Sequence, residues 1–137
     1  ILGATEIDLD FNVNVTTSSN GVIMGGSGGH SDAAYGADIA LVVAKTMNAR
    51  IPIIKKAVTT ITTPGSDIDC LVTERGIAIN PKRKDLLEKL KMSKLNIVSI
   101  EELMNLTYQF TREPKPFEHK DRVVGLVEYR DGTIIDV

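Results

Sequence analysis

Residues 39–44 read Ile-Ala-Leu-Val-Val-Ala, a continuous apolar run of strand length. A strand with one wet face alternates apolar and polar residues, and this run has no polar position. Such a run is typical of a strand that is covered on both faces, as in the parallel part of an α/β sheet. We therefore predict a central strand here and an α/β fold around it.

A strand is also predicted toward the N-terminus, over residues 6–15, because apolar and polar residues alternate there. Ile7, Leu9, Phe11, Val13 and Val15 fall on one face, and Asp8, Asp10, Asn12 and Asn14 fall on the other. This period of two predicts a strand with one wet side. The Ser-Ser-Asn-Gly cluster at 18–21 provides turn residues and leads into the short apolar segment 22–24, which indicates a hairpin. Ser31 or Asp32 is placed to cap a short helix after it.

Further strands are predicted toward the C-terminus. Residues 51–63 are rich in β-branched side chains and stop at Pro64-Gly65, which fits a long, partly exposed strand. Residues 68–73 form another apolar run, and residues 76–79 continue extended until Asn80-Pro81 breaks the chain.

Helices come late in the sequence. Leucines recur at helical spacing between charges over residues 82–91, and Ser99 resembles an N-cap with an acid, Glu102, three residues on. After them, residues 123–129 and 133–137 pair naturally across Arg130-Asp131-Gly132, a strong hairpin signal. We predict one α/β domain over residues 1–137: a single mixed β-sheet flanked by helices, with a C-terminal β-hairpin.

The bulk composition excludes several classes of partner. The chain has 137 residues with 16 basic and 18 acidic side chains, so no basic excess exists to neutralise nucleic acid or coat an anionic membrane. No apolar stretch approaches the roughly 20 residues that a bilayer requires. The single cysteine, Cys70, excludes an internal disulfide, fits a cytoplasmic protein, and is predicted to be a buried hydrophobe. Both chain ends look cut from a longer polypeptide.

A glycine cluster carries the strongest chemical signal. Gly25-Gly26-Ser27-Gly28-Gly29 follows a predicted strand directly, and such a backbone can bring amide N–H groups close to a ligand oxygen. In acyl transfer these donors would stabilise the oxyanion that develops on a thioester carbonyl. An equally open interpretation is that the glycine cluster forms only a flexible loop or a crowded turn and binds nothing. His30, next in sequence, could polarise a carbonyl or bind a carboxylate.

Other familiar sites are excluded by their spacing. No Lys-Ser or Lys-Thr follows the glycines, so a P-loop is absent, and the dinucleotide-binding glycine pattern does not occur in a βαβ unit. The two histidines, His30 and His119, lack partners at any recognised metal-binding spacing, so no metal is predicted.

Four segments together resemble one family. These are the stretches 6–14, 25–37, 58–65 and 72–81, which read EIDLDFNVN, GGSGGHSDAAYGA, VTTITTPG and VTERGIAINP. They closely resemble the C-terminal part of the citrate lyase alpha chain, and the likeness spans nearly the whole sequence. That family is similar to the CoA-transferase superfamily, whose second domain carries a Gly-x-Gly-Gly loop, a following Asp and a Val-Thr-Glu strand near the CoA-binding cleft.

The resemblance implies a CoA-transferase-like fold and an exchange in which citrate displaces acetate from a thioester on an acyl carrier (gamma) subunit. The carrier's prosthetic group is a CoA derivative, and the lyase (beta) subunit then cleaves the citryl product. Gly26, Gly28 and Gly29 match the family's loop and are assigned, with His30, to the catalytic site. Gly25, Ser27 and Asp32 are assigned to binding the carrier group.

One departure from the superfamily pattern limits the assignment. Many CoA-transferases attack the thioester with a glutamate that the resemblance places upstream of this chain, so Glu6 and Glu74 are not expected to inherit that role. The N-terminal half of the longer chain is therefore an expected partner, and this fragment alone is expected to be inactive. The alternatives are a non-catalytic carrier-binding or assembly module, and a CoA-ester hydrolase of the same superfamily.

Overall fold

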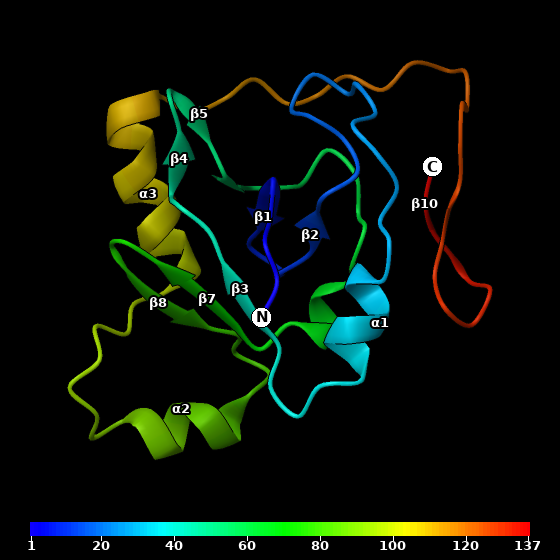
Figure 1. The fold of residues 1–137 in the computed structure, drawn as a ribbon. Coiled ribbons are helices and arrows are strands. Elements are labelled where there is room, and N and C mark those ends of the chain that lie inside the picture. Colours follow the sequence, from blue (N-terminus) through cyan, green and yellow to red (C-terminus); the bar gives the residue numbers. More distant parts are fainter.

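The computed structural model describes residues 1–137, and its strands form four small sheets (Figure 1). The strands are β1 (Glu6–Asp8), β2 (Val13–Asn14), β3 (Leu41–Val43), β4 (Met47–Asn48), β5 (Ile51–Pro52), β6 (Ile54–Lys55), β7 (Cys70–Thr73), β8 (Gly76–Ile79), β9 (Val127–Glu128) and β10 (Ile134–Asp136). The helices are α1 (His30–Tyr35), α2 (Lys84–Leu90) and α3 (Ile100–Thr111), with a 3-10 turn η1 (Gly65–Asp67). The mixed α/β class is confirmed, and the single sheet is wrong.

The N-terminal strand predicted over residues 6–15 is in fact a tight hairpin. β1 pairs antiparallel with β2 and, on its other side, parallel with β6. The chain turns because the Asp8 carboxylate accepts the backbone N–H groups of Asp10 at 3.0 Å and Asn12 at 2.9 Å, while Phe11 takes a left-handed φ of 65°. Local side-chain hydrogen bonds of this kind compete with the extended strand.

The hairpin predicted around the turn at 18–21 is confirmed, and because it follows the β1–β2 hairpin we call it the second hairpin. Ser18 N–H donates to the Val22 carbonyl at 2.9 Å and Met24 N–H donates to the Thr16 carbonyl at 2.8 Å, so residues 16–18 and 22–24 run antiparallel around the turn. The long strand predicted over residues 51–63 is wrong after Lys55. There the chain is irregular, and its threonines bond to both hairpins: Thr59 donates to Glu6 of β1 at 3.1 Å, and Thr60 accepts from Thr17 at 2.9 Å.

The run at 39–44 forms β3, which is the end strand in the order β3-β7-β8, so the predicted central position is wrong. It pairs parallel with β7, which pairs antiparallel with β8, and its other side carries a parallel bridge from Leu2 to Val42. The predicted cover on both faces is wrong within these 137 residues. Val42 is fully buried, whereas the side chain next to it, Val43, is 48 % exposed.

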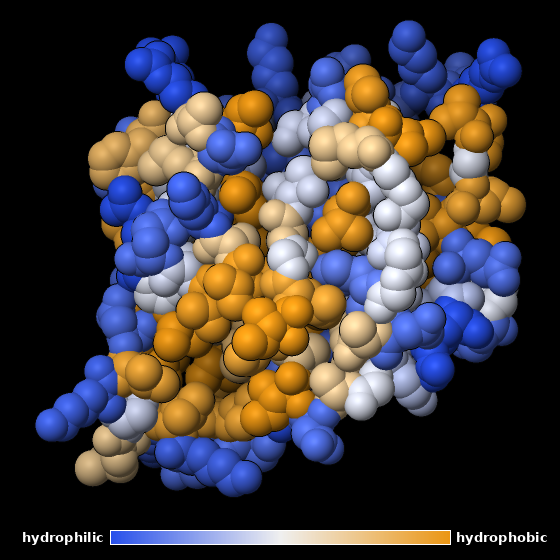
Figure 2. All heavy atoms as spheres, in the orientation of Figure 1, coloured by the Kyte–Doolittle hydropathy of each residue, from blue (hydrophilic) through white to orange (hydrophobic).

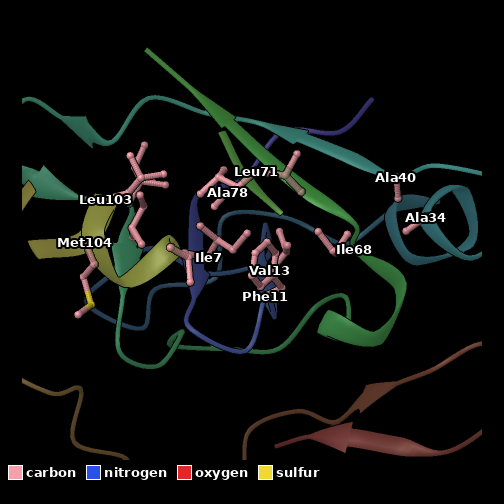
Figure 3. Packing of buried hydrophobic residues seen from close by; sticks show 14 residues of the cluster. Ile7, Phe11, Val13, Ala34, Ala40, Ile68, Leu71, Ala78, Leu103 and Met104 are labelled. Atoms are coloured by element: carbon pink, nitrogen blue, oxygen red, sulfur yellow. The ribbon is translucent and has the colours of Figure 1, made fainter. Parts of the chain in front are cut away.

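The main core gathers between α3, the β3-β7-β8 sheet and the first hairpin (Figure 3). Its fully buried members include Ile7, Phe11, Leu71 and Leu103. A second, smaller cluster of Cys70, Ile79 and Leu86 lies under α2. No helix of the structure is both long and apolar enough to cross a lipid bilayer.

Helix ends follow the sequence in one case and depart from it in another. Ser99 caps α3 as predicted, since its Oγ accepts the Glu102 N–H at 3.0 Å. The cap predicted at Ser31 or Asp32 is wrong, because both lie inside α1 and the N-cap is Gly29 without a side-chain bond. The C-terminal hairpin is confirmed as β9 and β10.

Candidate functional site

The glycine loop, residues 25–29, follows the second hairpin and enters α1 with backbone N–H groups that have no partner in the protein. None of its five N–H groups donates to another group of the protein, and all five residues are exposed. A Cβ added at any of the four glycines would meet no atom within 4 Å, so open space surrounds the loop. Gly28 has a φ of +54°, a conformation that L side chains rarely adopt, so glycine is required there for the loop's shape. The loop therefore presents free donors to its surroundings.

His30 holds the end of this loop. Its Nε2 lies 3.0 Å from the Gly3 carbonyl oxygen and its Nδ1 lies 2.7 Å from the Thr63 hydroxyl. Because a carbonyl oxygen can only accept, Nε2 carries a proton and donates it, and in the neutral ring Nδ1 accepts from Thr63. Both ring nitrogens are engaged, so His30 in this arrangement shapes the loop, and the predicted carboxylate contact would require one of these bonds to break.

The two other predicted site residues lie near the loop but face different partners. Asp32 forms a surface ion pair with Arg130 of the C-terminal hairpin, 3.1 Å from its Nε, and Arg130 also stacks on the Tyr35 ring at 4.1 Å. Ser27 is exposed, and its hydroxyl lies 3.5 Å from the Gly28 carbonyl, at the limit of a hydrogen bond. Ser27 therefore lies in the open loop, whereas Asp32 is paired with Arg130 of the C-terminal hairpin.

A buried carboxylate is the group that sequence reasoning undervalued. Glu6 has no exposed surface and pairs with Lys55, whose side chain is 9 % exposed. It also accepts from Asn14 Nδ2 at 2.9 Å, Ser19 Oγ at 2.7 Å, and the backbone N–H of Thr59 at 2.7 Å. Burial alone would raise the pKa of Glu6, but these hydrogen bonds outweigh it and hold that pKa below its ordinary value. The carboxylate is therefore charged and held in place.

A cavity of about 260 Å³ lies against the same group. Three partners of Glu6, namely Ser19, Lys55 and Thr59, line it together with Lys56 and Lys115. A second groove of about 750 Å³ runs between the second hairpin and the segment that leads to β9. Neither of these two is lined by a residue of the glycine loop.

Two further residues behave as the sequence predicts. The Glu74 carboxylate accepts the Thr46 N–H at 3.0 Å and the Thr46 hydroxyl at 2.6 Å, so its role is pairing. Cys70 is 5 % exposed, and burial, followed by the nearby Asp69 charge, raises the pKa of its thiol. A raised pKa keeps the thiol protonated, which makes it inert as a nucleophile.

Comparison with known proteins decides the family. The model for the citrate lyase alpha subunit matches residues 1–137, the whole chain. The chain belongs to the citrate lyase alpha subunit family. It is 50 % identical to the citrate lyase alpha chain of Klebsiella pneumoniae over 137 residues and 49 % identical to that of Escherichia coli strain K12 over 137 residues.

A solved structure agrees with this assignment. It comes from Streptococcus mutans, is described as an alpha subunit of citrate lyase in complex with citrate, and superposes with a TM-score of 0.94 at 48 % identity. That match covers 98 % of this chain and 26 % of the other. All of this chain matches 27 % of the Klebsiella and Escherichia chains, so it spans about a quarter of their length. Its predicted place in the C-terminal part of such chains stays a prediction.

Proposed function

We propose that this chain is the part of a citrate lyase alpha subunit that holds the acyl group during CoA-type transfer. The reaction is the exchange of acetyl for citryl on a CoA-like thioester of an acyl carrier protein, with citrate entering and acetate leaving. Family membership supports the subunit, and the free amides of the glycine loop support the site. The carrier group, the carrier and lyase subunits, and the CoA-transferase-like fold belong to this proposal.

The observation that supports the site best is a set of unused donors with room in front of them. Attack on a thioester carbonyl puts negative charge on its oxygen, and fixed N–H donors stabilise that charge by about 3–4 kcal/mol per donor. The N–H groups of Gly26, Gly28 and Gly29 bond to nothing in the protein and are exposed, so a carbonyl oxygen can reach them. The carrier's prosthetic group would supply the thioester itself.

His30 acts on this site by position. Its two ring bonds, to Thr63 and to the Gly3 carbonyl, fix the point where the loop enters α1. A loop fixed at this end loses less conformational entropy when it closes on a ligand, and preorganised donors gain most of their effect in this way. We therefore assign His30 to positioning the loop.

The test is Gly28→Val in the full-length alpha chain, with Gly125→Val as the matched control. A valine at residue 28 is strained at a φ of +54°, so the loop must change shape, whereas Gly125 lies in an exposed segment with open space around it and no such φ. We expect Gly28→Val to lower the transfer rate about 10²- to 10³-fold. Gly125→Val should leave the rate unchanged.

Two measurements decide the outcome. Acetyl-to-citryl exchange is assayed with citrate and the acetyl carrier, and assembly is followed by co-purification of the other subunits. An unchanged transfer rate in Gly28→Val would show that the loop is not part of the site. Loss of assembly together with transfer would favour a carrier-docking module, and release of acetate without citrate would favour a hydrolase.

A further inference from the structure

One face of the β3-β7-β8 sheet is apolar and only half covered. Side chains alternate along a strand, and the register joins the residues of each row across the three strands. The middle row, Val42, Leu71 and Ala78, lies in the main core, so the rows on either side of it face outward. These outward rows are Leu41, Cys70 and Ile79, and then Val43, Val72 and Ile77. We call them the outer face.

Helix α2 covers one row of the outer face and leaves the other open. Cys70 and Ile79 are 5 % and 6 % exposed because Leu86 of α2 packs on them. The other row is only partly covered: Ile77 is half-buried against the same small cluster, Val72 is half-buried, and Val43 is 48 % exposed. Figure 2 shows a broad hydrophobic area over the region where Figure 1 draws β3, β7, β8 and the N-terminus.

β3 and β7 have the sequences of strands with no solvent-exposed face. Leu41–Val43 has no polar residue and neither do residues 70–72, although β3 and β7 are parallel neighbours. Parallel strands with such runs are normally covered on both faces. An apolar face of this kind left exposed marks a contact surface. The second cover is absent from the 137 residues described.

We infer that the outer face packs against the part of the full-length alpha chain that lies outside these 137 residues. The chain accounts for 27 % of the length of its relatives, so most of such a polypeptide is available to cover the face. A contact within one polypeptide also needs no separate association step, which makes it the least costly way to bury the row. The outer face is then an interdomain interface.

Cysteine accessibility in the full-length chain tests this inference. Val43→Cys reports on the open row, and Met92→Cys is the control, because Met92 is 93 % exposed and lies after α2, outside both rows. The alpha chain is purified without other subunits, and maleimide labelling is followed by mass spectrometry under native conditions. We expect position 43 to react at least about tenfold more slowly than position 92, because a buried site reacts only through rare opening. Native Cys70 provides a buried internal reference.

Each result bears directly on the inference. Slow labelling of Val43→Cys in the monomeric fraction supports it. Labelling as fast as at position 92 overturns it, and so does protection that disappears when an oligomer is diluted to monomer, which would mean that a second copy covers the face. If Val43→Cys lowers the melting temperature, Val72→Cys takes its place, since Val72 lies in the same row and is only half-buried in these 137 residues.

Discussion

At the scale of single residues, the Glu6–Lys55 pair is the feature with the largest energetic consequence. Both side chains are withdrawn from water, which costs several kcal/mol per ion before any contact is made. The cost is offset because Glu6 receives five hydrogen bonds, from Lys55, Asn14, Ser19 and the backbone and hydroxyl of Thr59. No buried side-chain polar atom lacks a partner in the structure. Removing one member should therefore cost more than the pair itself contributes.

Lys55→Met tests this directly. The variant leaves the Glu6 carboxylate buried without its cation, and we expect the free energy of unfolding to fall by about 3–5 kcal/mol. Lys56→Met is the matched control, because Lys56 pairs with Glu113 at the surface, where both side chains are more than half exposed. That exposed pair should contribute about 0–1 kcal/mol. Urea unfolding measures both, and equal losses would show that Lys55 acts only through its methylene packing.

The same pair should give an acid-side signature. The folded pKa of Glu6 lies below its ordinary value of 4.5, so its stabilisation is present above that pH and is lost as pH falls through the folded pKa. Asp8 works in the opposite sense, since burial raises its pKa above 3.8 in spite of its hydrogen bonds. Comparing wild type with Glu6→Gln separates the two, because Asp8 is common to both. Unfolding followed below pH 5 should show a smaller loss of stability in the variant.

The open shape of the glycine loop was predictable because its signal is local, whereas the surroundings of Glu6 were not. Four glycines in five positions made an open loop predictable, and the structure shows one. Glu6 looked like the first residue of a strand with a wet face, but its main partners, Lys55 and Thr59, lie 49 and 53 residues away. No period in the residues around Glu6 reports such contacts. The binding and catalytic assignments of the loop stay predictions.

At the scale of elements, local sequence signals again predicted the structure, whereas more distant contacts were missed. Ser99 and the Asp-Gly turn act on their own neighbours, and both α3 and the β9–β10 hairpin form where they indicate. The single sheet was wrong because turns such as the one held by Asp8 divide the strands into short pieces. Alternation of residue types predicts an extended chain but does not say where a side-chain hydrogen bond will turn it.

The C-terminal hairpin makes an element-scale prediction, because the Tyr129 phenol attaches it to the main fold beside the Arg130–Asp32 pair and the bond from Ile61 N–H to Asp136 at 2.6 Å. The Tyr129 hydroxyl donates to Asp67 of η1 at 2.6 Å, and burial, followed by this bond, raises the pKa of Tyr129 to about 12. Tyr129→Phe should lower stability by about 1.5–3 kcal/mol, the usual range for a bond to a charged group. Hydrogen exchange in β9 and β10 should accelerate.

Tyr35→Phe is the control for that variant. Tyr35 also contacts the hairpin, because Arg130 stacks on its ring. The Tyr35→Phe change removes a hydroxyl that makes no hydrogen bond in the protein. Stability and exchange should therefore be unchanged. Because the folded pKa of Tyr129 is raised, its contribution is complete below pH 10 and declines as pH rises toward 12. An alkaline titration in which Tyr129→Phe and wild type lose stability in parallel would contradict the tether.

At the scale of the whole molecule, the chain has one large core and one small one, and they should not open together. The large cluster holds fourteen buried residues and joins α3 to two sheets, whereas the small one holds three buried residues under α2. Regions with few buried apolar contacts open at lower free energy than the main core. The small cluster also lies on the outer face, where we infer that the remaining chain docks. Its stability in isolation is then the lower limit of its stability in the full protein.

Paired truncations test this division. Leu103 of α3 is fully buried in the large cluster, and Leu103→Ala should cost about 2–5 kcal/mol and speed exchange throughout the chain. Leu86 of α2 is 8 % exposed in the small cluster, and Leu86→Ala should chiefly speed exchange in α2, because α2 can separate while the large core remains packed. Native-state hydrogen exchange measures both. If α2 and α3 open at the same free energy in wild type, the chain opens as one unit and the division is wrong. If their opening free energies differ, the difference should become smaller in the full-length chain, where the outer face is covered.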